Sequence, residues 1–311
     1  MKTLVGLGSL RPPPQGSAIT IGTFDGIHLG HRALIAHTVA AASEAGLAAV
    51  VVTWDRHPNE TLRPERAPLL LTSPERKAEL MLPTGVDYLV VLPFDRALST
   101  WPPERFVRDV LVQGLGGRRV LVGAGWRFGH KAAGDVPLLE KLGAEMGFVA
   151  AGLDLAAHEG VPISSSRVRE AVAAGEVELA AELLGRPFDV DGIVVRGAGR
   201  GDDLGYPTAN VDVAPKLVKP RRGVYAGRTR VDETWYQAAI NVGVNPTFGG
   251  DEASTPVMVE TYLLDFAGEL HGLELRVEFH RRLRDELKFD SVDDLVAQMA
   301  RDVEATRELT C

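Results

Sequence analysis

Cysteine is almost absent from this chain of 311 residues, whose one cysteine is the last residue, Cys311. A single thiol cannot form a disulfide within the chain, so a disulfide-stabilised fold is excluded and a reducing compartment, the cytoplasm, is expected. Positive charge is also scarce: 34 Lys and Arg stand against 42 Asp and Glu, which gives a net charge of −8. Nucleic acid is therefore not an expected partner, because binding a phosphate backbone requires a basic surface.

Long apolar runs are missing as well. No uninterrupted apolar stretch approaches the roughly 20 residues that cross a bilayer, and none follows Met1 and Lys2. We therefore expect a soluble protein without a membrane as partner. The length is sufficient for two domains of about 100–200 residues each.

The hydrophobic pattern changes once along the chain. Up to about residue 185, short apolar strands alternate with helical stretches, which predicts a parallel sheet with crossover helices. After Arg186 and Pro187, strand-like segments separated by turn residues predict a small antiparallel barrel. The amphipathic segment 291–309 predicts a final helix with Ser291 as its N-cap. We therefore predict an α/β domain over 1–185 and a barrel domain over 186–311.

The segment from Gly22 to His31, which reads GTFDGIHLGH, is the most informative part of the sequence. It follows the apolar strand 18–21 and precedes a helical pattern that ends at Gly46, so it forms a glycine-rich strand-to-helix turn. Backbone N–H groups and the helix dipole favour anions there. His28 and His31 could donate hydrogen bonds to a triphosphate and to the charge that develops at its α-phosphorus. Capping histidines and a zinc site are the alternatives, although the sequence offers no further cluster of zinc ligands.

Three further segments of the first domain could complete a nucleotide site. The loop 53–58 leaves the end of a strand, where open α/β sheets bind ligands. The loop 122–135 follows another strand, and its aromatic side chains could flank a planar ring. Residues 163–169 supply three serines and two arginines, whose donors suit a phosphate cradle. Each segment could instead be an ordinary loop or a helix cap.

In the second domain, the glycines of the loop 196–206 make it flexible enough to wrap phosphates. Thr208 and Asn210 follow it two residues apart, so an extended chain presents their oxygen atoms on one face, as suits Mg²⁺ beside phosphate. Glu260 stands in an otherwise apolar strand, where an unpaired carboxylate would be costly to bury. A functional role for Glu260 is therefore expected, and an ion pair at the barrel rim is the alternative.

Taken together, these segments resemble the bacterial bifunctional riboflavin kinase/FMN adenylyltransferase family, also called FAD synthetase, almost from end to end. The sequences GTFDGIHLGH, DRHP, WRFG with GD, and SSSRVR resemble its adenylyltransferase motifs in order and spacing. The sequences GYPTAN, GVYA, NVGVNPTF, VETYLLDF and LRDELKF resemble its kinase motifs. The resemblance implies a Rossmann-like nucleotidyltransferase domain followed by a riboflavin kinase barrel with a C-terminal helix.

The implied activity has two ATP-dependent steps. The barrel phosphorylates riboflavin to FMN, and the first domain transfers AMP from ATP to FMN, which yields FAD and pyrophosphate; Mg²⁺ is the implied metal. The resemblance makes Glu260 the general base of the kinase, with Thr208 and Asn210 at Mg²⁺, and has His28 and His31 stabilise the transferred group. It also implies ATP or phosphate contacts from Gly22, Phe24, Asp25, Gly30, Ser164, Ser165, Arg169, Gly197, Arg200 and Gly205, and flavin contacts from His57, Phe128, Asp135, Tyr225 and Arg284.

The chain departs from the family pattern at three places. Ala124 and Gly125 stand where the family usually has an acidic residue followed by Asn or Asp. Asp202 replaces an Arg of the kinase loop, and Arg56 replaces a Pro. A riboflavin kinase whose first domain has lost or changed its transferase activity is therefore an alternative. A flavin- or nucleotide-binding sensor without turnover is the alternative from another class, and the presence of both histidines and Glu260 argues against it because binding alone requires no base.

Overall fold

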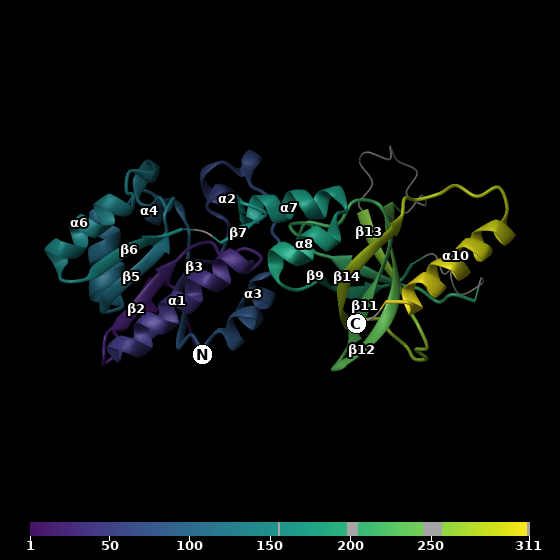
Figure 1. Cartoon of the computed structure of the whole chain (residues 1–311), viewed down its shortest axis with the longest axis horizontal. Helices are drawn as coiled ribbons and strands as arrows, with labels where there is room; N and C mark the ends of the chain where they lie inside the picture. The colour runs from purple at the N-terminus through teal and green to yellow at the C-terminus, as the bar shows by residue number, and fades with distance from the viewer. Residues whose placement is uncertain (155, 198–204, 245–256, 310–311) are drawn as a thin grey trace. The chain divides into compact units, whose positions relative to one another are not determined.

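The structure is a computed structural model that describes residues 1–154, 156–197, 205–244 and 257–309. The chain folds into two compact units, Met1–Ser165 and Ser166–Cys311 (Figure 1). Across the described ranges, no helix combines the length and the apolar character needed to cross a membrane.

The first unit contains the parallel sheet that the alternating pattern predicts. Its six strands are all parallel, in the order β1-β4-β3-β2-β5-β6. Val50, Val51 and Val52 in the centre of the sheet are fully buried, because apolar clusters cover both faces. The strands are β1 (Lys2–Val5), β2 (Ser17–Ile21), β3 (Ala48–Trp54), β4 (Tyr88–Leu92), β5 (Gly117–Gly123) and β6 (Val149–Leu153).

Helices pack on both faces of this sheet. Side chains of α1 (Leu29–Ala45) and α3 (Pro74–Met81) cover one face, and those of the π-helical segment η4 (Val107–Gly114) and α6 (Val136–Met146) cover the other. Helix α1 ends at Gly46, as the sequence predicts, with a left-handed φ of 64°. The shorter elements are η1 (Leu7–Ser9), α2 (Pro58–Leu62), η2 (Pro64–Arg66), η3 (Leu82–Thr84), α4 (Arg96–Ser99), α5 (Pro103–Phe106), η5 (His130–Ala132), β7 (Ala157–His158) and β8 (Val161–Pro162).

The second unit is the predicted antiparallel barrel with a C-terminal helix. The barrel is closed in the order β10-β13-β12-β11-β14-β9, and every neighbouring pair is antiparallel. Helix α10 (Val292–Arg307) follows it, and the predicted N-cap is confirmed because Ser291 Oγ accepts a hydrogen bond from the Asp294 N–H at 3.1 Å. The strands are β9 (Phe188–Val195), β10 (Ala209–Val213), β11 (Gly223–Val231), β12 (Thr234–Val244), β13 (Val257–Leu263) and β14 (Glu274–Arg284).

Two helices precede the barrel, α7 (Ser165–Ala174) and α8 (Val177–Leu184). Helix α8 packs on β9 and β14, and its side chains Val177, Leu183 and Leu184 are fully buried. The compact units accordingly divide between Ser165 and Ser166 and not at residue 185. Our boundary at residue 185 remains a prediction about which part of the chain folds independently.

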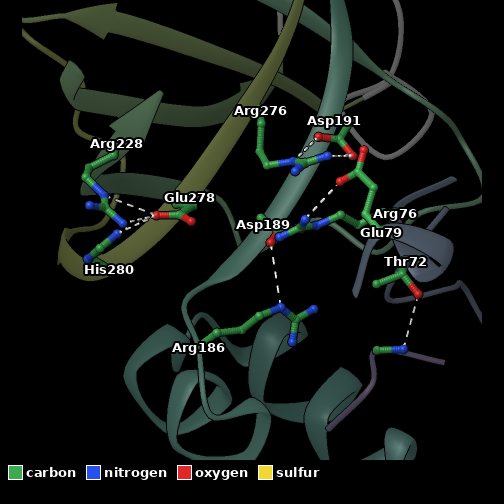
Figure 2. A network of polar contacts seen from close by, with 11 residues as sticks. Thr72, Arg76, Glu79, Arg186, Asp189, Asp191, Arg228, Arg276, Glu278 and His280 are labelled. Carbon is green, nitrogen blue, oxygen red and sulfur yellow. Dashed lines mark hydrogen bonds and ion pairs between the residues drawn. The ribbon is translucent and has the colours of Figure 1, made fainter. Parts of the chain in front are cut away.

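Polar pairs tie neighbouring strands of the barrel together. On its outer surface Arg228 of β11 donates to Glu278 of β14 at 2.7 Å, and Arg276 of β14 donates to Asp191 of β9 at 2.6 Å (Figure 2). Inside the barrel, the hydroxyl groups of Thr229 and Thr261 lie 2.7 Å apart. Residues next to Thr261 in β13 therefore point outward, because side chains alternate along a strand.

Candidate active sites

The first candidate site lies at the point of the parallel sheet where the order of the strands reverses. Strand β2 lies between β3, the next strand along the chain, and β5, so the connections run to opposite sides of β2. Open α/β sheets bind ligands at such a point, beyond the carboxyl ends of the strands. The predicted loops begin there: 22–31 follows β2, 53–58 starts at the end of β3, and 124–135 follows β5.

The two histidines of the turn form one stacked pair at the start of α1. His28 is the N-cap, and its Nδ1 accepts a hydrogen bond from the His31 N–H at 3.2 Å. The rings stack with their centroids 3.6 Å apart. Because Nδ1 of His28 accepts, a neutral His28 carries its proton on Nε2, where it can be donated. His28 is thus a capping histidine, which was one of the alternatives to a phosphate contact. Because the cap uses Nδ1, the ring keeps its donor at Nε2.

His31 contains a buried polar atom for which a ligand would provide the partner. Its Nδ1 has no hydrogen-bond partner within the described ranges, which is unusual for a buried nitrogen. Burial, and then the neighbouring His28 and Lys77, lower the pKa of His31 well below its usual value. His31 is therefore neutral at pH 7 and can donate one hydrogen bond without adding charge.

The backbone of the turn is shaped by its buried residues. Phe24 and Ile27 have φ angles of 47° and 44°, which are strained for side chains other than glycine. The Asp25 carboxylate stabilises this strained turn, because it accepts hydrogen bonds from the backbone N–H groups of Leu71 and Thr72 at 2.9 and 3.2 Å. Phe24 packs edge-on against the His31 ring. Both side chains therefore hold the turn, and the phosphate contacts predicted for Phe24 and Asp25 stay predictions.

Two predicted glycines belong to the turn, and two predicted serines come from the segment 163–169. Gly22 directly follows β2, and a Cβ atom on Gly30 would lie 3.2 Å from His28 Nδ1, so only glycine leaves the ring undisturbed. Ser165 Oγ donates to the Asp25 carbonyl at 2.9 Å and ties the serine segment, with Ser164, to the turn. A second hydrogen bond holds the turn, from the Gly26 N–H to Thr72 Oγ1 at 3.2 Å (Figure 2).

Arg169, the remaining predicted phosphate ligand of the first domain, lies in α7. Its Nη2 is 3.4 Å from Ser166 Oγ, and both residues belong to the second compact unit. Its role in phosphate binding stays a prediction.

The predicted flavin contacts of the first unit fall into two places. Phe128 and Asp135 share one loop, where Phe128 stacks on Trp126 with the centroids 4.5 Å apart and Asp135 caps α6. His57 lies beyond β3, where it caps α2, and it lines a small cavity with Thr23 and Lys77. The structure therefore joins Phe128 with Asp135 but puts His57 in a separate cavity.

The unusual pair Ala124 and Gly125 begins the aromatic loop. Both residues are exposed, and Gly125 does not have a positive φ. A Cβ atom at Gly125 would have no neighbour within 4 Å. Glycine is therefore not required there by the backbone, and the position has room for a polar side chain.

The second candidate site is built on a row of residues that runs across five strands of the barrel. Asn210 of β10 pairs with Glu260 of β13, and Glu260 pairs with Asn241 of β12. The row continues to Val224 of β11 and to Arg284 of β14. Directly paired residues share one face of a sheet, here the outer face. Glu260 therefore lies between two amide side chains.

A cavity of about 400 Å³ lies over this row. Glu260 and Asn241 line it together with Thr208, which precedes β10 by one residue. Apolar side chains of α10, including Leu295 and Met299, line it as well. A mostly apolar cavity with a few convergent polar groups is the usual form of a small-molecule site.

Arg284 joins the barrel to α10. Its guanidinium forms a two-pronged ion pair with Asp302, with distances of 3.0 Å from Nε to Oδ1 and 2.7 Å from Nη2 to Oδ2. Both residues line the cavity, and Asp302 also accepts from Gln298 at 2.9 Å. The predicted flavin contact Arg284 thus belongs to the cavity wall and holds the helix that covers it.

Three other predicted residues of the second unit have different positions. A Cβ atom on Gly197 would meet the Asn210 side chain at 2.0 Å, so the glycine loop starts against the row. Gly205 has a φ of 79° and lies just before Tyr206 of the cavity. Tyr225 is fully buried inside the barrel, where it packs on Phe279, and does not join the cavity residues. Arg200 lies outside the described residues, as do Asp202 and 245–248 of the motif NVGVNPTF.

Sequence reasoning did not single out Asn241 and Asp302. Asn241 lies in a quoted motif, but only the pairing of β12 with β13 sets it beside Glu260. Asp302 interrupts the apolar face of α10, since it follows Leu295 by seven residues and Met299 by three. That interruption is a signal by which Asp302 could have been found.

Comparisons with known proteins match both units. The family described as FAD synthetase matches residues 10–167, and the family described as riboflavin kinase matches residues 184–310.

Similar whole proteins have both parts in one chain. The bifunctional riboflavin kinase/FMN adenylyltransferase of Pseudomonas fluorescens is 38% identical over 99% of this chain and 98% of its own. Its counterpart from Escherichia coli (strain K12) is 37% identical over 99% of this chain and 97% of its own. A solved structure described as a macrolide-efflux protein from Streptococcus pneumoniae is 29% identical, with a TM-score of 0.89 and full coverage of both chains.

Proposed function

The chain belongs to the family of bifunctional riboflavin kinase/FMN adenylyltransferases, and from this we propose that it makes FAD from riboflavin in two ATP-dependent steps at two separate sites. It is a transferase in both steps, and ATP is the co-substrate of each. FMN is the product of the first step and a substrate of the second.

The kinase step takes place in the cavity of the barrel. The primary alcohol of riboflavin attacks the γ-phosphorus of ATP, its proton passes to the Glu260 carboxylate, and ADP leaves. The observation that carries this assignment is the position of Glu260 on the cavity wall between Asn210 and Asn241. The apolar side of the cavity, toward α10, receives the flavin ring.

Mg²⁺ is held beside Glu260. Thr208 and Asn210 provide neutral oxygen atoms next to one carboxylate, and Mg²⁺ typically takes one or two carboxylates together with substrate phosphates. Among the described residues there is no cluster of three or more His, Cys, Asp or Glu side chains suited to a metal, which fits an ion brought in with ATP. When bound, Mg²⁺ neutralises charge on the phosphates.

The adenylyl transfer step takes place at the turn 22–31. A phosphate oxygen of FMN attacks the α-phosphorus of ATP, and pyrophosphate leaves. Nε2 of His28 and Nδ1 of His31 donate to the phosphate oxygens on which charge develops. Both rings act without forming a covalent bond, as positioned donors.

The experiment is incubation of the chain with riboflavin, ATP and Mg²⁺, followed by separation of riboflavin, FMN and FAD. FAD as the final product supports both steps. FMN that accumulates without FAD would leave a kinase with an altered first unit, for which Ala124 and Gly125 give the reason. Binding without any product would leave a sensor and contradict the proposal.

A further inference from the structure

Lys77 is a cation of the first unit that the two-step reaction leaves without a role. It lies on α3, and its Nζ donates a hydrogen bond to the Thr23 carbonyl at 2.8 Å, within the turn 22–31. The side chain lines a small cavity with Thr23, Asp25, Asp55 and others at the carboxyl ends of β2 and β3. The buried amine thus belongs to the part of the sheet where ligands bind.

The acidic neighbours of Lys77 are engaged elsewhere. Asp25 accepts from the backbone of Leu71 and Thr72, and Asp55 pairs with Arg56 at 2.8 Å. Lys77 itself forms no ion pair within the described ranges. Burial lowers the pKa of Lys77, and the charge of Asp25 opposes this only in part. A buried ammonium without a paired carboxylate is costly, and an entering anion would offset that cost.

Lys77 acts on the same region as the histidine pair. Its charge is one of the causes that lower the pKa of His31, so the ammonium and that ring are electrostatic neighbours. Nδ1 of His31 is buried and has no partner among the residues that the structure describes, and Nε2 of His28 carries a donor proton. An ammonium has three N–H donors, of which the Thr23 carbonyl takes one. Two N–H donors of Lys77 remain for a ligand.

We propose that Lys77 is a third phosphate-binding group of the adenylyl transfer site, where it holds the turn through Thr23 and donates to the oxygens of the triphosphate that leave as pyrophosphate. The proposal rests on the proposed function of the first unit. Lysine suits this task because it supplies a compact charge without fixed geometry, as the many oxygens of a triphosphate require. His31 is a neutral donor, so Lys77 adds an amine group whose charge can face the phosphates.

The test compares four variants in the intact chain. Lys77→Met removes the donor and the charge, Lys77→Gln keeps a donor for Thr23 without the charge, and Lys77→Arg keeps both. Lys141→Met is the matched control, because it removes one positive charge from an exposed position of α6 in the same unit. Tryptophan fluorescence of each protein reports whether the first unit is folded, since Trp54, Trp101 and Trp126 lie there.

Adenylyl transfer from ATP to FMN is measured as KM for ATP and kcat over a pH series. We expect kcat/KM for ATP to fall by about 10- to 100-fold in Lys77→Met and Lys77→Gln, because both variants lose the charge-assisted hydrogen bonds from Lys77 to the phosphates. Lys77→Arg recovers part of the loss, and Lys141→Met stays within about twofold of the natural chain. The acidic limb of the pH profile also moves to higher pH in Lys77→Met and Lys77→Gln, because removing the charge lets the pKa of His31 rise.

Two results would overturn the proposal. If Lys77→Gln has the kinetics and the pH profile of the natural chain, Lys77 is only a structural support of Thr23. If Lys77→Met also has the kinetics of the natural chain, Lys77 does not have that structural role either. If the natural chain forms no FAD, adenylyl transfer itself fails as the function. Calorimetric affinity for magnesium pyrophosphate then decides separately: a loss of about tenfold in Lys77→Met supports the phosphate contact, and equal affinity contradicts it.

Discussion

In the first unit the polar groups of the site come mainly from one short turn, whereas in the second unit they come from strands far apart in the sequence. The turn 22–31 supplies both histidines within four residues and fixes them by capping and stacking. The barrel site joins Asn210, Glu260 and Asn241 only through strand register. A site within one turn can be predicted from a motif, while a site made by register requires the structure.

The largest expected effect separates the two regions. Glu260→Gln keeps the shape of the side chain but removes the base, so riboflavin phosphorylation should fall by about 10²–10⁴-fold while adenylylation of FMN is spared. Glu274→Gln, an exposed position at the start of β14, is the control. Both rates are measured on the same preparation. Kinase activity within about threefold of the natural chain would contradict the assignment of Glu260.

The boundary between the regions gives the next test. Fragment 166–311 contains the whole second compact unit and should fold and phosphorylate riboflavin. Fragment 187–311, which the sequence pattern alone favours, lacks α7 and α8 and exposes the surface that Val177, Leu183 and Leu184 cover. Burial of each such side chain contributes about 1.5–3 kcal/mol, so the shorter fragment should unfold at clearly lower urea concentration. Equal midpoints would support the predicted boundary at residue 185.

A gain of activity is expected at Gly125 in the first region. Gly125→Asn adds an amide at an exposed position with free space and no positive φ. If the missing polar side chain weakens adenylylation, the variant should form FAD from FMN and ATP about tenfold faster, the value of one added hydrogen bond to a charged group. Robust FAD synthesis by the natural chain without a gain in the variant would mean that the departure is compensated elsewhere.

The smallest effect is a pH dependence of stability in the first unit. The folded state keeps the pKa of His31 below that of the unfolded chain, so it binds fewer protons and loses stability as the pH falls through about 6.5, whereas nothing is lost above this pH. At pH 5.5 the loss should reach about 1 kcal/mol, and His31→Gln should remove it. Urea unfolding followed by tryptophan fluorescence reports this, since Trp54, Trp101 and Trp126 lie in the first unit. An equal loss in both proteins would exclude His31 as its source.

The fold follows from the sequence where local pattern and tertiary structure agree. Alternating strands and helices predicted the parallel sheet, turn-separated strands predicted the barrel, and Ser291 marked the start of α10. The position of α7 and α8 could not be predicted, because an amphipathic helix does not specify which surface its apolar face covers. That choice depends on the exposed faces of β9 and β14.

The sites show the same limit at the level of single residues. The pattern placed His28 at the start of a helix, and the structure confirms that position. It did not reveal that Asp25 holds the turn through Leu71 and Thr72, since those partners are about 46 residues away. The motif did not reveal that strand alternation turns the Tyr225 ring into the barrel, and the flavin contact of Tyr225 stays a prediction. Long-range partners and side-chain direction are thus what the sequence leaves open.

The most direct test of two separate sites is complementation between two inactivated chains. Glu260→Gln disables the barrel, and His28→Asn removes an imidazole from the turn while keeping a side chain that caps α1 well. With riboflavin, ATP and Mg²⁺, the Glu260 variant alone should leave riboflavin unchanged, the His28 variant alone should stop at FMN, and an equal mixture should form FAD. A Glu260 variant that also fails to convert FMN to FAD, or a mixture that yields no FAD, would contradict the account.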